Sequence, residues 1–144
     1  MMKRTLFALA LAGLVTTAMA SAPALPTTAA PAGAEVYIIS PADGATVGLE
    51  VTVRFGLKGM GVAPAGVVKE NTGHHHLLVD VKDLPAAGQP IPADARHIHF
   101  GGGQTQTTLK LTPGTHTLQL ELGDANHVPF EPALVSKKIT IHVK

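Results

Sequence analysis

Eight histidines stand out in a chain of 144 residues that has no cysteine. Six of them fall in three short blocks, which are the triplet 74–76, the pair His97 and His99, and His127. Residues i and i+2 of a β-strand share one face, so the pair at 97 and 99 can offer two imidazoles to one ion. Without Cys, thiolate zinc sites and thiol catalysis are excluded, and any metal chemistry must depend on imidazole.

The three blocks predict a metal site. Imidazole ligands suit Cu(II) or Zn(II), and the Irving–Williams order favours copper, with zinc as the alternative. A soft thioether from Met60 could complete a copper site. Asp80 and Asp124 are candidate acceptors for the second ring nitrogen of a ligated imidazole. The candidate ligands are His74, His75, His76, His97, His99, His127 and Met60.

Short runs rich in β-branched residues alternate with Gly and Pro, and no ten-residue stretch has a helical period. This pattern predicts an all-β domain, an immunoglobulin-like or fibronectin-like seven-stranded β-sandwich, with a cupredoxin-like barrel as the rival architecture. The predicted strands are 36–40, 50–57, 75–81, 96–100, 105–111, 115–122 and 137–143.

Alternation within these strands assigns their faces and ends. If consecutive strands run antiparallel, the three histidine blocks meet at one end of the sandwich, and His116 and His142 lie at the other. His75 shares one face of its strand with Leu77 and Val79, and this face is expected to point toward the core. The sixth strand is predicted to have a buried face of Leu118, Leu120 and Leu122 and a solvated face of Thr117, Gln119 and Glu121.

The first twenty residues have the features of a cleaved signal peptide. Lys3 and Arg4 are followed by an apolar run and by the small-x-small pattern Ala18–Ala20. Residues 21–34, rich in Ala and Pro, are predicted to be a flexible leader, and residues 35–144 the folded domain. We therefore expect an exported protein, periplasmic or secreted, with no membrane span in the mature chain. A formal charge of +1 argues against nucleic-acid binding.

From about Val36 onward the chain resembles a bacterial family of exported proteins known only as domain-of-unknown-function family 4399. The resemblance implies a compact β-sandwich in the periplasm and no established activity. It rests on four blocks: 59–66 (GMGVAPAG), 73–80 (GHHHLLVD), 97–101 (HIHFG) with Gln104 and Thr105, and 123–129, with Gly123, Asp124 and 126–129 (NHVP).

These observations favour a periplasmic metal-binding protein that serves delivery, buffering or resistance, with another periplasmic metal-handling protein as its partner. Because imidazole must be neutral to bind a metal, affinity is expected to fall as the pH drops through about 6. An enzyme is less favoured: the His-x-His strand looks weakly like copper and zinc superoxide dismutases, but the usual disulfide is impossible here. The third hypothesis is an envelope interaction module whose histidines only bind a protein or glycan, or hydrogen bond to loops.

Overall fold

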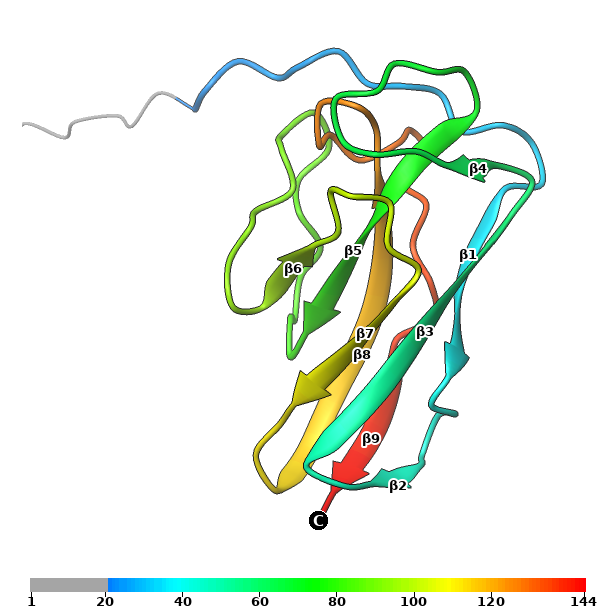
Figure 1. The fold of residues 1–144 in the computed structure, drawn as a ribbon. Coiled ribbons are helices and arrows are strands. Elements are labelled where there is room, and N and C mark those ends of the chain that lie inside the picture. The colour runs from blue at the N-terminus through cyan, green and yellow to red at the C-terminus, as the bar shows by residue number, and fades with distance from the viewer. Residues whose placement is uncertain (1–20) are drawn as a thin grey trace, which may run out of the picture.

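The computed structural model describes residues 21–144, so the predicted signal peptide, residues 1–20, lies outside the described part. Within the described range the chain forms strands only (Figure 1), and it has no helix with the length and apolarity to cross a membrane. The strands are β1 (Glu35–Ser40), β2 (Thr46–Val47), β3 (Glu50–Lys58), β4 (Gly61–Val62), β5 (Thr72–Val79), β6 (His97–His99), β7 (Gln106–Lys110), β8 (Gly114–Gly123) and β9 (Ile139–Val143).

The strands form two facing sheets, which confirms the predicted all-β sandwich. One sheet has the order β1-β3-β7, and the other has the order β2-β9-β8-β5-β4, with β6 paired to β5. All seven predicted strands are present. The two-residue strands β2 and β4 were not predicted, and they add parallel pairings to β9 and β5.

The core lies between the sheets and is built by period-two alternation. In β3, Val51, Val53 and Phe55 are buried while the residues between them are exposed. In β8, Leu118, Leu120 and Leu122 are fully buried and belong to the same core cluster. Burial of one such side chain stabilises the fold by roughly 1.5–3 kcal/mol, so this alternation holds the strand faces in register.

Strand direction separates the two ends of the domain. Strand β8 runs antiparallel to β5, with Val79 opposite Leu118 and His74 opposite Gly123. The start of β5 and the end of β8 therefore lie at one end. His116 and His142 lie at the other end, near the carboxyl terminus (Figure 1).

The segment 21–34 lies against the first of these ends (Figure 1). The Leu25 amide donates to the Gly88 carbonyl at 2.7 Å, and the Ala30 amide donates to the Glu131 carbonyl at 3.1 Å. The segment expected to be a flexible leader thus makes backbone hydrogen bonds to the domain.

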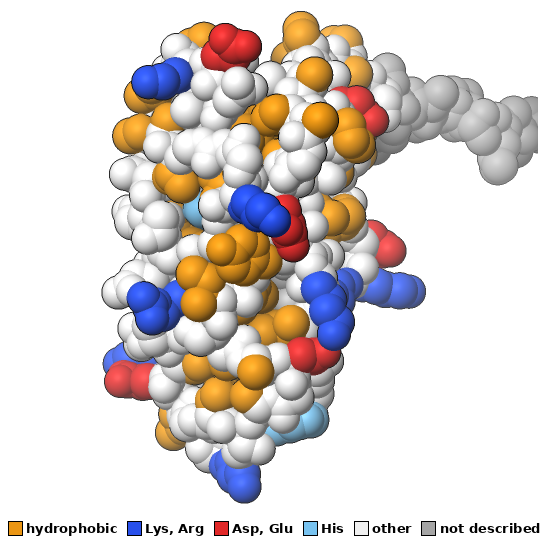
Figure 2. Space-filling view, turned by 90° about the vertical axis from the view of Figure 1, so that its right-hand side faces the viewer, with side chains coloured by type: hydrophobic (Ala, Val, Ile, Leu, Met, Phe, Trp, Pro, Cys, Tyr) orange, Lys and Arg blue, Asp and Glu red, His pale blue; other side chains and the backbone are white. Residues whose placement is uncertain are grey.

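Acidic and basic side chains are interspersed over the face shown in Figure 2, with apolar side chains between them. Nucleic-acid binding depends on a basic patch or stripe. The visible charge distribution gives this face no such feature.

Candidate metal site

Four imidazoles come together on the outer face of the larger sheet. His74, His76, His99 and His127 each offer one ring nitrogen, and these four nitrogens all lie within 4.8 Å of one another. A hydrogen bond of 3.2 Å joins His74 Nε2 and His127 Nδ1. Four convergent imidazole nitrogens are a ligand set suited to one transition-metal ion.

Three separate segments supply these side chains. Strand β5 carries His74 and His76, which share a face because they are two residues apart. Strand β6 pairs with β5 so that His99 lies directly opposite His76. The loop that follows β8 carries His127.

Asp124 shapes the loop that carries His127. Its Oδ1 accepts hydrogen bonds from the backbone amides of Asn126 (2.8 Å) and Val128 (3.1 Å), and its Oδ2 accepts one from Thr28 Oγ1 (2.7 Å). His127 has a positive φ of 63°, a conformation that costs a non-glycine residue energy unless its surroundings hold it. Asp124 therefore supports the site through the backbone of the loop, whereas the sequence suggested an acceptor for an imidazole.

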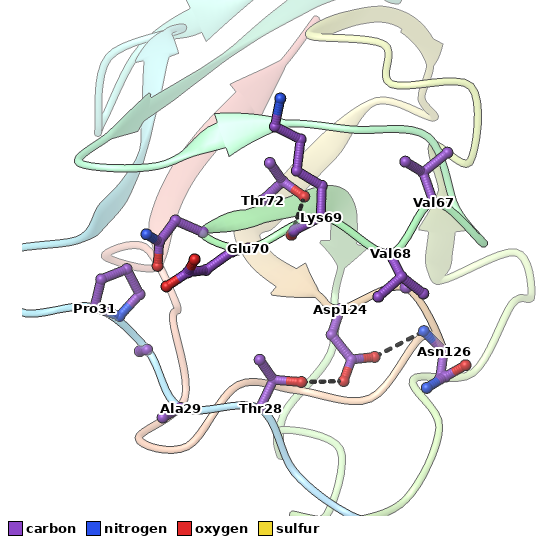
Figure 3. Close-up of a pocket in the computed structure, with 13 residues that line it drawn as sticks. Thr28, Ala29, Pro31, Val67, Val68, Lys69, Glu70, Thr72, Asp124 and Asn126 are labelled. Atoms are coloured by element: carbon purple, nitrogen blue, oxygen red, sulfur yellow. Dashed lines mark hydrogen bonds between the residues drawn. The ribbon is translucent and has the colours of Figure 1, made fainter.

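The bonds of Asp124 to Thr28 and Asn126 lie beside a pocket of about 610 Å³ (Figure 3). The pocket is lined by residues 28–31, 67–72 and 124–126. The amino-terminal segment thus contacts the loop of His127 directly.

A second loop, residues 63–66, joins all three histidine segments. The Ala63 amide donates to the carbonyl of Gly73 at 2.9 Å, immediately before His74. The Ala65 amide donates to the carbonyl of Gly101 at 2.9 Å, two residues after His99, and the Gly66 amide donates to that of Ala125 at 3.0 Å. Loop 63–66 therefore fixes the three segments relative to one another.

Burial favours the neutral form of His74, His76 and His99. The side chains of His74 and His76 are inaccessible to solvent. Burial, together with neighbouring imidazoles, lowers the pKa of His74 to about 4 and that of His76 to about 3. Burial also lowers the pKa of His99, followed by the effect of His127. The expected loss of metal affinity near pH 6 assumed an ordinary imidazole pKa, which is above the lowered pKa of His74, His76 and His99.

Unpaired buried polar atoms of the described residues lie on β5, β6 and β8. Among residues 21–144, the buried side-chain nitrogen and oxygen atoms without a hydrogen-bond partner belong to five residues: His74, His75, His76, His99 and Glu121. A buried polar group without a partner costs roughly 1–3 kcal/mol. A bound metal ion would provide partners for the imidazole nitrogens that face the cluster.

The cluster is open on one side. A pocket of about 300 Å³ is lined by His76, His99 and His127 and, opposite them, by Pro90, Ile91 and Ala93. The Ile91 amide donates to the His127 carbonyl at 2.7 Å, which holds the apolar cover against the site. Of the imidazoles that line it, His99 and His127 are partly exposed, so an ion can reach the cluster from this side.

Two predicted ligands lie outside the cluster. His75 points into the core, where its ring centroid is 5.2 Å from that of Phe55, because neighbouring residues of a strand face opposite sides. His97 shares a face with His99, but its Nδ1 lies 2.9 Å from Asp94 Oδ1. That carboxylate also accepts the amide of His97, so a local turn holds this imidazole away from the cluster.

Two further predictions need correction. Met60 is partly buried and packs against the hydrophobic core, so its thioether fills space there. Asp80 follows the far end of β5, where its Oδ2 lies 2.7 Å from His116 Nδ1 and its Oδ1 accepts the amide of Thr117. Asp80 is far from the cluster because the length of β5 lies between them.

Glu121 was assigned to a solvated face, and this assignment is wrong. Its side chain is fully buried, and burial raises its pKa to about 7. The alternation placed it correctly on the face opposite Leu120 and Leu122, but that face is covered here. Its cross-strand partner is His76, a pairing that depends on strand register and has no signal in the sequence.

A family model with the description "Domain of unknown function (DUF4399)" matches residues 53–144, which contain the four clustered histidines. No curated protein and no solved structure matches the chain significantly.

Proposed function

The chain belongs to the DUF4399 family, a domain of unknown function, and from its site we propose that it is a metal-binding protein that holds one ion among His74, His76, His99 and His127. A single observation carries the proposal: these four imidazoles converge within 4.8 Å, although they come from three segments of the chain. Histidines with a purely structural role would not need ring nitrogens from separate segments to converge.

Imidazole ligands favour a transition-metal ion of intermediate softness. Four nitrogen donors without thiolate or carboxylate suit Cu(II) and Zn(II), and we propose copper ahead of zinc because copper stands higher in the Irving–Williams order. Met60 plays no part in this preference, since it packs against the core.

We further propose that the protein is exported to the periplasm or secreted, where it buffers a metal ion or delivers it to another periplasmic metal-handling protein. The basis is the sequence of residues 1–20, with its basic start, apolar run and Ala-Met-Ala pattern. Sequencing the amino terminus of the protein from the periplasmic fraction tests this, with Ser21 as the expected first residue.

The interaction module is the second candidate. The exposed side chains of Val67 and Val68, 45% and 89% accessible, adjoin the pocket of Figure 3 and favour a contact surface at the same end of the domain. That surface is separate from the buried imidazoles, so it does not explain their convergence.

Two neighbouring histidines of β6 provide the test. Thermal melts at pH 7 should show that Cu(II) or Zn(II) at about 100 times its dissociation constant adds roughly 2.7 kcal/mol to the wild-type stability, about 10 °C in Tm. His99→Ala should lose most of this gain, because it removes a ligand. His97→Ala is the matched control and should keep the gain, because that imidazole bonds to Asp94.

Equal gains in the His99 and His97 variants would contradict the assigned ligand set. Absence of any gain in the wild-type protein would reject metal binding and leave the interaction module ahead. A superoxide dismutation assay on the metal-loaded protein separates a binding protein from an enzyme, and we expect no activity above that of the free ion.

A further inference from the structure

Glu121 is a buried carboxylate for which the described structure provides no partner. Its side chain is 0% exposed, and neither carboxylate oxygen accepts a hydrogen bond within residues 21–144. The ion pairs of the described residues do not include it. A buried carboxylate of this kind is costly unless a partner arrives.

Strand register places this carboxylate beside the histidine cluster. His99 lies opposite His76, and His76 lies opposite Glu121, so the three residues form one row across β6, β5 and β8. Residues directly opposite on antiparallel strands have side chains on the same face of the sheet. Glu121 therefore shares the outer face with the cluster.

The imidazole of His76 lies over β8. A Cβ added to Gly123 would come within 2.8 Å of His76 Cε1 and 3.3 Å of its Nδ1. Gly123 and Glu121 are two residues apart in β8 and share a face. The ring edge that contains Nδ1 therefore lies over the strand that carries Glu121.

Resting on the metal site proposed above, we infer that Glu121 is the positioning residue of His76: when the ion binds, its carboxylate would accept the N–H of the His76 ring nitrogen that does not bind the ion, a contact that the described structure does not make. Both nitrogens of His76 and both oxygens of Glu121 lack partners within the described chain, so a contact formed on metal binding would serve both groups. Metal-bound histidines commonly donate their second N–H to a carboxylate, which fixes the tautomer and raises ligand basicity. Glu121 thus has the role that the sequence suggested for Asp80 and Asp124.

This contact also supplies charge. The four imidazoles are neutral ligands, and a divalent ion would bring two positive charges into a buried place. A carboxylate on the adjacent strand stabilises that charge without occupying a coordination position. We therefore expect the site to bind a divalent ion more tightly with Glu at position 121 than with a neutral residue there.

Glu121→Gln and Glu121→Leu test the inference. Competition titration with a chromogenic chelator should show that the dissociation constant for Zn(II) rises about 10–100-fold in both variants. The Tm of the metal-free Glu121→Leu variant should stay equal or rise, because it removes a buried polar group that has no partner. Glu70→Gln, at an exposed position, is the matched control and should bind as the wild type does.

A spectroscopic readout separates positioning from mere packing. In ¹⁵N-edited NMR spectra of the Zn(II)-loaded wild-type protein, the ring N–H of His76 should be visible and protected from exchange. Glu121→Leu should lose that signal or its protection.

If the wild-type protein binds Zn(II) and both Glu121 variants bind equally well with the His76 signal unchanged, the role of Glu121 is overturned and the metal site stands. If the wild-type protein binds neither Zn(II) nor Cu(II), the metal site itself is overturned. Should the Leu variant fail to fold, the Gln variant still decides the matter through its dissociation constant.

Discussion

At the scale of single residues, the imidazoles at the two ends of the domain differ because their surroundings differ. His74, His76 and His99 have lowered pKa values because burial opposes their positive charge. His116, at the other end, has a raised pKa, first because of its hydrogen bond to Asp80 and then because of the Thr112 carbonyl. Both ring nitrogens of His116 face acceptors, which favours the doubly protonated ring. Burial therefore favours the neutral ring at His74 and His76, whereas the acceptors around His116 favour the charged ring.

His116 should stabilise the fold only while it is protonated. Because its pKa is higher in the folded chain than the ordinary 6.5, its contribution is fully present below pH 6.5 and is lost as the pH rises through the raised value. His116→Gln should therefore lower the free energy of unfolding by roughly 1 kcal/mol at pH 5.5 and by less at pH 9. Urea denaturation at both pH values measures the difference.

The control for this variant is its metal response. His116 lies far from the cluster, so His116→Gln should keep the full metal-induced gain in Tm. An equal loss of stability at both pH values would show that the Asp80–His116 contact carries no charge.

At the scale of elements, loop 63–66 connects the segments that form the site. Its turn has a hydrogen bond from the Val67 amide to the Pro64 carbonyl at 3.1 Å, and Gly66 has a φ of 81°. Positive φ at the third residue is typical of a type II turn, which readily accepts Pro at its second residue, here Ala65. Substitution at Ala65 can thus remove one amide while the turn is kept.

Ala65→Pro should weaken metal binding and leave the turn intact. It removes the N–H that donates to the Gly101 carbonyl, so the segment that carries His99 is released from loop 63–66. We expect the dissociation constant for Zn(II) to rise about tenfold, the equivalent of one lost hydrogen bond of roughly 1 kcal/mol or slightly more. Titration of the purified variant measures the change.

Ala65→Ser, which keeps the N–H, is the matched control and should bind as the wild type does. Wild-type affinity in Ala65→Pro would show that the three histidine segments hold their positions without this loop.

The elements also show what the sequence can and cannot predict. Period-two alternation sufficed for the seven predicted strands and for His75 on the core side, because sheet burial follows directly from the pattern. It could not predict that Asp94 holds His97 in a local turn, nor that Glu121 pairs with His76. Those facts depend on loop conformation and strand register, which distant segments determine.

At the scale of the whole molecule, the buried imidazoles link folding to pH. His74, His75 and His76 are all inaccessible to solvent, and burial lowers each pKa from 6.5 to about 4, 4 and 3. The unfolded chain therefore takes up protons first as the pH falls. By linkage, stability is present above pH 6.5 and is lost progressively as the pH falls toward 4.

Urea denaturation of the metal-free protein should show this loss between pH 7 and pH 5. His75→Leu should make the dependence shallower by about one proton and raise stability at pH 5, because Leu needs no partner in the core beside Phe55. A pH dependence as steep as that of the wild type would mean that His75 stays protonated inside the fold.

The path of segment 21–34 has a practical consequence for purification. The Gln89 side-chain amide donates to the Ala22 carbonyl at 3.3 Å, and the next residues, Pro90 and Ile91, line the pocket above the cluster. A polyhistidine affinity tag fused ahead of Ser21 would bring extra imidazoles close to this pocket, compete for the ion and inflate the apparent stoichiometry. Lys144 lies at the far end of the domain (Figure 1), so a carboxyl-terminal tag leaves the metal content attributable to the protein itself.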